Sequence, residues 1–285
     1  MLAYYSVAAD REFWSEHWGG HTVEELLAVA RTSPLTDLIV AALPRTGVVL
    51  EAGCGLGQYV LLLRERGWAA IGVDWSRDAL ASARRVSQAP LAAMGLTALA
   101  VRDGAVASYV SLGVVEHDPA GPDGILAEAR RVLAPDGTLV ISVPYVNGLR
   151  RLGARWIRRQ NHALEAAGGK FYQYAFTRAE LLGALARHGF TPLAVHPYDP
   201  ARVLRSLRRR TRRTGDEARQ RAAAAAREGA VSGRAGGAPA GATAREGVTP
   251  PRRRGLLARV ARQVLYTEPA LRLLGHMLLV VARRA

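Results

Sequence analysis

One stretch of the sequence, residues 48–59, constrains the fold more than any other. A β-branched run ends in the carboxylate of Glu51, and three glycines follow it at alternate positions, Gly53, Gly55 and Gly57. Glycine lets a backbone turn tightly and approach a ligand where a Cβ would collide. An amphipathic segment at 58–66 comes next, and a second apolar run ends on Asp74. Strand, glycine turn, helix and strand in this order predict a β-α-β unit.

The ends of this unit indicate a ligand that carries a ribose. An acidic residue at the tip of the second strand, here Asp74, can accept hydrogen bonds from both ribose hydroxyls. The dinucleotide fingerprint Gly-x-Gly-x-x-Gly requires a glycine where this chain has Gln58. A charged Glu51 beside the turn would also repel a pyrophosphate. A ligand with a cationic end therefore fits better, and the alternative is a turn that only connects strand to helix.

The residues Glu51-Ala52-Gly53-Cys54-Gly55-Leu56-Gly57, followed by Gly72-Val73-Asp74, resemble the class I S-adenosylmethionine-dependent methyltransferases. Three further motifs recur in the order known from the small-molecule, methyltransferase type 11-like members. They are Ser-Leu-Gly-Val-Val-Glu-His at 111–117, Ala-Arg-Arg-Val-Leu-Ala-Pro-Asp-Gly at 129–137 and Val-Pro at 143–144. The resemblance implies an α/β, doubly wound, Rossmann-like sheet of seven strands, mostly parallel with an antiparallel last strand and helices on both faces.

The same resemblance divides the chain into three parts. Residues 1–45 are expected to form an N-terminal helical lid, with capping-box and proline signals for two helices at 22–31 and 33–44. The S-adenosylmethionine-binding core is expected at 46–197 plus 275–285. Residues 198–274 form an Arg/Ala/Gly-rich insertion whose middle we expect to be disordered between two amphipathic helices.

The resemblance also implies a set of site residues around S-adenosyl-L-methionine. The glycines would leave room for the methionine part, Asp74 would bind the ribose at an exposed strand end, and Trp75 would pack on the adenine. The expected cofactor-binding residues are Glu51, Gly53, Cys54, Gly55, Gly57, Asp74, Trp75, Leu96, Leu112 and Gly113. No metal is needed for this chemistry.

His117 follows the fourth expected strand, where the family often places groups that face the substrate. It is the candidate catalytic residue, as a general base for a nucleophile that keeps its proton. The alternative is a structural histidine at the start of a helix.

Two positions depart from the family pattern. Aligned on Leu99 and Asp103, the acidic residue that usually accepts from the adenine amino group is replaced by Gly95. The aspartate that commonly begins the fourth strand is replaced by Ala107. Losing one charge-assisted hydrogen bond costs about 1.5–3 kcal/mol of binding, so these changes affect the expected cofactor affinity and not the fold.

The charge of the chain is unevenly distributed. Residues 1–149 hold 11 basic and 16 acidic side chains, whereas residues 150–285 hold 28 basic and 8 acidic ones, which gives −5 and +20 of the total +15. The helices that flank the insertion are either ordinary surface helices or a basic amphipathic patch that touches an anionic membrane surface. With no signal peptide, no long apolar run and the single cysteine Cys54, we expect a cytoplasmic protein, peripheral at the membrane if that patch binds lipid.

The sequence thus predicts a methyltransferase that transfers a methyl group to a small-molecule or lipid- or sugar-linked acceptor by in-line displacement. The alternative is a non-catalytic domain of the same fold that uses its basic insertion to contact a partner or a membrane surface. A nicotinamide-dependent oxidoreductase is disfavoured by Gln58 and by the antiparallel last strand. Nucleic acid is not an expected partner, because the chain lacks the Asn/Asp-Pro-Pro-Tyr/Phe motif of amino-directed nucleic-acid enzymes.

Overall fold

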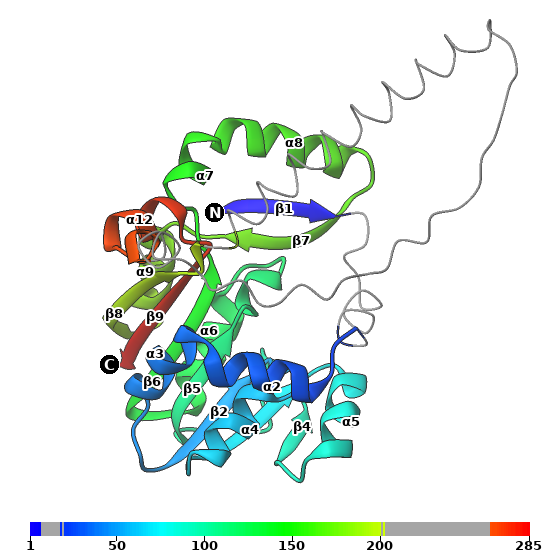
Figure 1. Cartoon of the computed structure of the whole chain (residues 1–285), viewed down its shortest axis with the longest axis vertical. Helices are drawn as coiled ribbons and strands as arrows, with labels where there is room; N and C mark the ends of the chain where they lie inside the picture. The colour runs from blue at the N-terminus through cyan, green and yellow to red at the C-terminus, as the bar shows by residue number, and fades with distance from the viewer. Residues whose placement is uncertain (7–17, 19, 201, 203–262) are drawn as a thin grey trace, which may run out of the picture.

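The computed structural model describes residues 1–6, 18, 20–200, 202 and 263–285. Its centre is a seven-stranded sheet in the order β4-β3-β2-β5-β6-β9-β8 (Figure 1). The strands are β2 (Val48–Ala52), β3 (Ala69–Asp74), β4 (Leu91–Ala93), β5 (Val106–Leu112), β6 (Leu133–Pro144), β8 (Phe190–Tyr198) and β9 (Met277–Arg284). The pairs from β4 to β6 are parallel, and β9 runs antiparallel to both β6 and β8. The predicted fold class is confirmed.

Helices cover both faces of the sheet, each through its own apolar cluster. One cluster joins the sheet to α6 (Asp123–Val132) and α9 (Arg178–Arg187). The other joins it to α2 (Val23–Thr32), α3 (Pro34–Ala42), α4 (Gln58–Glu65) and α5 (Arg77–Val86). Burial on both faces explains why the central strands read as continuous apolar runs in the sequence.

The strand order reverses between β2 and β5, which fixes the position of a ligand crevice. From β2 the chain moves outward to β3 and β4, and then returns to the other side of β2 at β5. In doubly wound sheets, ligands bind outside the carboxyl ends of the strands at this switch point. Glu51, Asp74 and Leu112 end or nearly end the three strands that meet there.

The N-terminal segment differs from the helical lid that we expected at 1–45. Helices α2 and α3 exist, and the capping box of Thr22 with Glu25 begins α2. They pack against α4 and one face of the sheet instead of covering the crevice. Residues Leu2–Ser6 form a strand, β1, that pairs antiparallel with β7 (Lys170–Ala175). The strand β1 has no local signal in the sequence, because its partner strand lies about 170 residues further along the chain, with Leu2 opposite Ala175.

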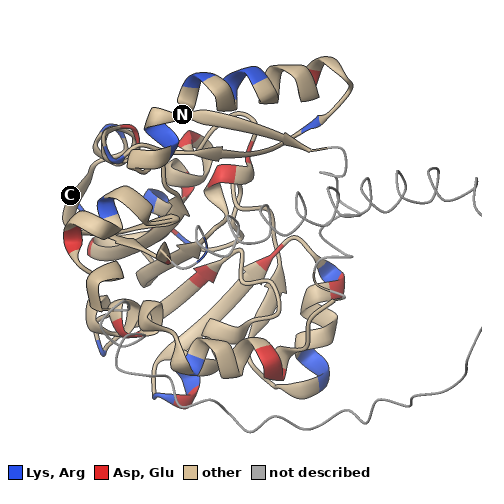
Figure 2. Ribbon diagram, turned by 45° about the horizontal axis from the view of Figure 1, so that its top comes forward, with Lys and Arg blue, Asp and Glu red and all other residues tan. Residues whose placement is uncertain are grey.

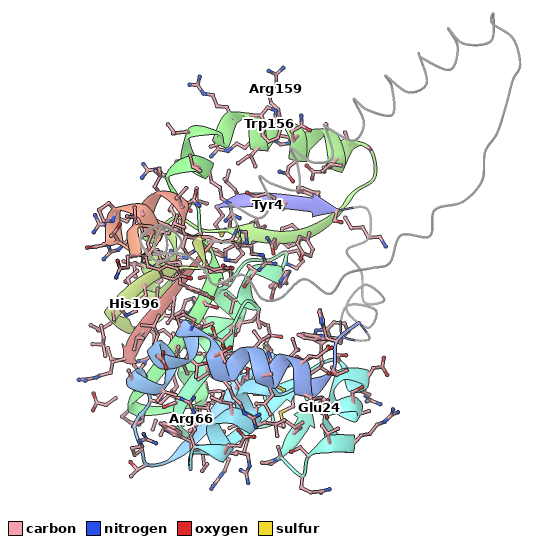
Figure 3. All side chains as sticks on the ribbon, viewed as in Figure 1. Tyr4, Glu24, Arg66, Trp156, Arg159 and His196 are labelled. Atoms are coloured by element: carbon pink, nitrogen blue, oxygen red, sulfur yellow. The ribbon has the colours of Figure 1, made fainter. Side chains whose placement is uncertain are left out.

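The two-stranded sheet and two helices form a cap that the sequence did not predict. The cap consists of β1, α7 (Gly148–Leu152), α8 (Ala154–Ala166) and β7. Apart from β1, these elements lie within the expected core range of 46–197, between β6 and α9. Figures 1 and 3 show α8 over β1, on the side away from the seven-stranded sheet. A small apolar cluster around Leu2, Val146 and Ala175 holds the cap together.

Of the insertion at 198–274, only the ends belong to the described part of the chain. Its C-terminal end forms the short helix α12 (Glu268–Leu274), which leads into β9. The predicted flanking amphipathic helices and disordered middle lie outside the described residues. Among the helices that the structure describes, none has the length and apolar character needed to cross a bilayer.

Candidate functional site

A cavity of about 610 Å³ opens at the carboxyl ends of β2, β3 and β5. It brings together every predicted site residue except Gly55 and Gly57, although these residues come from five separate segments of the chain. Those that line it are Glu51, Gly53, Cys54, Asp74, Trp75, Leu96, Leu112, Gly113 and His117. The switch point of the sheet therefore coincides with the predicted site.

The glycine loop between β2 and α4 needs glycine for both conformation and space. Gly53, Gly55 and Gly57 have φ values of 81°, 52° and 74°, in the left-handed region that L-side chains rarely adopt. A Cβ on Gly53 would lie 2.4 Å from Cγ2 of Val114, and one on Gly55 would lie 2.5 Å from the ring of Trp18. Gly55 and Gly57 thus shape the loop without lining the cavity.

The carboxyl group of Asp74 holds the glycine loop in place. Its Oδ2 accepts a hydrogen bond from the N–H of Gly55, and its Oδ1 accepts one from the N–H of Ser76, both at 2.8 Å. Asp74 is 5% exposed, so the expectation of an exposed strand end is wrong. Burial raises its pKa, and the amide hydrogen bonds oppose that shift. Each oxygen keeps lone-pair capacity for a further donor from the cavity.

Glu51 lies deeper, beneath the start of α4. Its Oε2 accepts a hydrogen bond from the N–H of Val60 at 2.9 Å. Burial raises the pKa of Glu51 to about 8, so the carboxyl group is largely protonated at neutral pH. The sequence led us to expect a charged group here, whereas its desolvation favours the neutral form. A cation in the cavity would shift it back towards the carboxylate.

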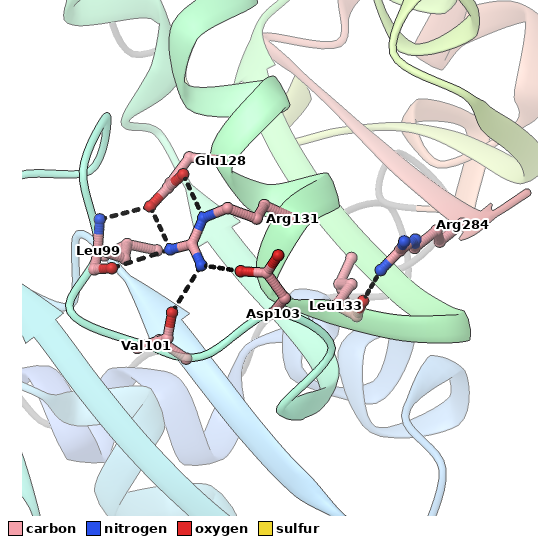
Figure 4. A network of polar contacts seen from close by, with 7 residues as sticks. All are labelled: Leu99, Val101, Asp103, Glu128, Arg131, Leu133 and Arg284. Atoms are coloured by element: carbon pink, nitrogen blue, oxygen red, sulfur yellow. Dashed lines mark hydrogen bonds and ion pairs between the residues drawn. The ribbon is translucent and has the colours of Figure 1, made fainter.

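The opposite wall of the cavity comes from the loop after β4, which carries Gly95, Leu96 and Thr97. Arg131 of α6 fixes this loop (Figure 4). Its guanidinium donates to the carbonyl oxygens of Leu99 and Val101 at 2.9 and 2.8 Å, and it pairs with Glu128. Glu128 in turn accepts from the N–H of Leu99. A side chain outside the cavity therefore sets the position of one of its walls.

His117 ends the short 3₁₀ helix η1 (Val115–His117) at the rim of the cavity. Its Nδ1 lies 2.7 Å from the carbonyl oxygen of Tyr172 in β7, and the two rings meet edge to face at 5.3 Å. A carbonyl oxygen only accepts, so Nδ1 carries the proton and Nε2 is the basic nitrogen of the neutral ring. The cap thus fixes the tautomer of this histidine.

Several lining residues were not among the predicted ones: Trp18, Gln58, Gly95, Thr97, Val114, Asp118, Pro119 and Ile125. Trp18 belongs to an aromatic cluster that could have suggested a pocket cover. Gln58 is the first residue of α4, and within the described part of the chain its buried Oε1 has no hydrogen-bond donor. A donor on a bound ligand could form the missing hydrogen bond. The sequence alone could not show that this oxygen lacks a donor.

A family model described as a methyltransferase domain matches residues 50–141, the segment that supplies nearly all of this cavity. This segment is a methyltransferase domain of the S-adenosylmethionine-dependent kind. Its cofactor is S-adenosyl-L-methionine. The residues fit this group: the glycine loop leaves space, two buried carboxyl groups face the cavity, and Gln58 offers an unsatisfied acceptor.

Solved structures share the fold of this methyltransferase. A methyltransferase from Archaeoglobus fulgidus gives a TM-score of 0.55 at 16% identity, over 96% of this chain and 100% of that chain. One from Mesorhizobium loti gives 0.52 at 16% identity, over 89% and 99%. Geranyl diphosphate C-methyltransferase from Streptomyces coelicolor A3(2) gives 0.54 at 15% identity, over 99% and 91%. No curated protein matches the sequence significantly.

Proposed function

We propose that this methyltransferase acts on a small-molecule or lipid- or sugar-linked acceptor, by in-line displacement. The observation that carries the proposal is the single cavity in which Glu51, Asp74 and the glycine loop meet His117. When bound, S-adenosylmethionine supplies an electrophilic methyl group on a sulfonium. The protein's task is to hold the acceptor atom in line with that methyl group at about 3–3.5 Å.

The chain's own groups would hold the cofactor by its polar ends. Asp74 would accept from the ribose hydroxyls with the lone pairs that the loop amides leave over. Glu51 and the Oε1 of Gln58 would face the cationic amino group, and Leu112 and Gly113 would line that end. Trp75, which is 41% exposed, would cover the adenine, with Leu96 on the wall beside it. Binding of the cation would lower the raised pKa of Glu51.

His117 would act as the general base. Its Nδ1–H donates a hydrogen bond to the carbonyl oxygen of Tyr172, so Nε2 is the atom that would take a proton. The bound cofactor would supply the methyl carbon for the new bond to the acceptor oxygen or nitrogen, and its sulfur would keep the electron pair of the broken carbon–sulfur bond. The proton of the acceptor then moves to Nε2 of His117.

A second cavity supports an acceptor with an apolar part. It measures about 700 Å³, lies at the carboxyl end of β8, and is lined by apolar side chains of α2, α3 and α12. Leu112, Ser142, Leu279 and His196 are successive partners across β5, β6, β9 and β8. Three strand spacings therefore separate Leu112, which lines the first cavity, from His196, which lines the second, by about 14 Å. The geranyl diphosphate methyltransferase acts on an acceptor of this mixed kind, with an apolar chain and a polar end.

Calorimetric titration with S-adenosylmethionine and S-adenosylhomocysteine tests the proposal. Asp74→Asn keeps a hydrogen-bonding side chain but loses the charge, so affinity for both ligands should fall by about 2 kcal/mol, roughly thirtyfold. Asp37→Asn, on the exposed surface of α3, is the matched control. His117→Gln should bind both ligands normally and lose turnover to S-adenosylhomocysteine. Unchanged affinity in Asp74→Asn would overturn the assigned role of Asp74, and full turnover in His117→Gln would overturn that of His117.

A further inference from the structure

The cap helix α8 has one face packed against the protein. Ala154, Ile157 and Asn161 recur at helical spacing, and all three contact the cap strand β1 or its apolar cluster. The side-chain oxygen of Asn161 accepts from the N–H of Tyr5 at 2.9 Å. With this side turned inward, residues 155, 156 and 159 fall on the opposite side of the helix. Figure 3 shows Trp156 and Arg159 on this outer side.

The outer face of α7 and α8 combines positive charge with exposed apolar side chains. Segment 148–166 holds five arginines and one acidic residue, and the arginines colour α8 in Figure 2. Arg150 turns inward to the carbonyl oxygen of Tyr145. The other four are exposed and make no ion pair with any described residue: Arg151, Arg155, Arg158 and Arg159. Between them, Leu152 is 84% exposed and Trp156 is 52% exposed.

We propose that this face, formed by Leu152, Arg155, Trp156 and Arg159, docks on an anionic lipid bilayer. A helix that lies in a membrane interface carries basic residues for the headgroups and Trp or Leu for the acyl boundary. Tryptophan in particular favours the interface, where its ring is half apolar and half wet. A nucleic-acid surface would use the arginines but gives no role to an exposed Leu152. The charge and the apolar residues together favour lipid.

Docking in this way is compatible with the methyltransferase site. β7 contacts η1 through the pair of Tyr172 and His117, whereas α8 contacts β1. Figure 1 places α8 on the side of the two-stranded sheet that faces away from the seven-stranded sheet. A bilayer against the outer face of α8 would therefore leave the cavity at the ends of β2, β3 and β5 uncovered.

Co-sedimentation of the full chain with vesicles tests the proposal. Vesicles of equimolar phosphatidylglycerol and phosphatidylcholine should bind the protein, and vesicles of phosphatidylcholine alone should bind it much more weakly. One arginine near an anionic surface strengthens binding about fivefold, equivalent to about 1 kcal/mol. The double variant R155Q/R159Q should therefore lose roughly 25-fold in affinity. W156A should also weaken binding, and this loss should persist at higher salt, which screens only the charges.

The matched control is R77Q/R85Q, which removes the same charge from two exposed positions of α5. It should bind vesicles like the wild type. The Tm of the arginine variants should stay near the wild-type value, because these side chains are exposed. Equal losses in the α8 and α5 variants would mean that only net charge matters and would overturn the proposal. It would also be overturned by absence of vesicle binding together with binding of a duplex RNA that depends on Arg155 and Arg159.

Discussion

Asp74 shows how one buried carboxyl group serves both the fold and the cavity. Its two hydrogen bonds to Gly55 and Ser76 lock the glycine loop onto the end of β3. Replacing Asp74 by alanine would leave these buried N–H groups without acceptors, which costs about 1–3 kcal/mol for each group. A loss of binding in such a variant would therefore mix loop collapse with the loss of a ligand contact. Asparagine keeps one of the two acceptors and places its NH2 group beside the other N–H, so a melting curve has to accompany the binding measurement.

Gly95 stands where the resemblance predicts an acidic residue, and the structure leaves room for one. A Cβ at this position meets no atom within 4 Å, and its φ lies outside the left-handed region. Gly95→Asp should therefore cost little stability. If the carboxylate accepts from the adenine amino group, affinity for S-adenosylmethionine and S-adenosylhomocysteine should rise equally, up to about tenfold for a bond worth 1.4 kcal/mol.

The control ligand for Gly95→Asp is an analogue with an inosine base, which presents an acceptor where adenine presents a donor. Calorimetry should detect no gain for this analogue, because two acceptors cannot form a hydrogen bond. An equal gain for the inosine analogue would show that position 95 does not face the adenine amino group. A melting curve of the same variant reports any strain separately.

The residues that the sequence singled out at the strand ends lie together in one cavity, because Glu51 and Asp74 lie at the ends of the strands of one β-α-β unit and Gly113 follows the neighbouring strand. Glu51, Asp74 and Gly113 were placed by local motifs. The protonation of Glu51 and the orphan oxygen of Gln58 could not be predicted in the same way. Both depend on burial by segments distant in sequence, and local patterns carry no information on burial of that kind.

At the scale of elements, the loop between β4 and β5 depends on α6. This loop has no regular structure to hold it, and the guanidinium of Arg131 bonds two of its carbonyl oxygens and the carboxylates of Asp103 and Glu128. The pKa of Glu128 is lowered, chiefly by its hydrogen bond to Arg131. The position of the cavity wall at Gly95 and Leu96 therefore depends on α6, a helix on one face of the sheet.

Arg131→Gln should loosen the loop and weaken cofactor binding without removing any cavity residue. Glutamine is too short and has too few donors to reach the loop carbonyls and both carboxylates. We expect the Tm to fall by several degrees and the affinity for S-adenosylhomocysteine to fall severalfold, measured by thermal melting and calorimetry. Arg102→Gln, an exposed neighbour in the same loop, should change neither. If Arg131→Gln bound the ligand like the wild type, the network would serve stability alone.

The bounds of elements with local sequence signals were predicted within a few residues. The cap has no such signals and was not predicted. The helices α4 and α5 and the strand β3 follow their caps and apolar periods, so their bounds agree closely with the sequence prediction. β5 begins at Val106 and ends at Leu112, about three residues earlier than expected. The strand β1 could not be predicted because its five residues, Leu2–Ser6, are stabilised by β7 and α8, which are distant in sequence.

At the scale of the whole molecule, buried ionisable groups set the dependence of stability on pH. Burial raises the pKa of Glu51 and of Glu116 to about 8. Such groups stabilise the fold fully below their unfolded pKa of about 4.5, and this stability is lost as the pH rises through about 8. His276 has the opposite sign, because burial lowers its pKa to about 3. Its contribution is present above its unfolded pKa of about 6.5 and is lost as the pH falls towards 3.

Glu116 offers the clearest test of this balance, because it is only 2% exposed and its Oε2 has no donor within the described part of the chain. Of these three groups, two lose stability upward from about pH 4.5 and one loses it downward from about pH 6.5, so their combined contribution to the free energy of unfolding peaks at about pH 5. Glu116→Gln mimics the protonated form and should flatten the fall between pH 5 and 9, by up to about 5 kcal/mol at the alkaline end. Urea unfolding at a series of pH values measures this, with the exposed Glu24→Gln as the control that should keep the wild-type slope. If Glu116→Gln kept the wild-type slope, ionisation of Glu116 would not destabilise the folded protein, and the burial argument for this residue would be wrong.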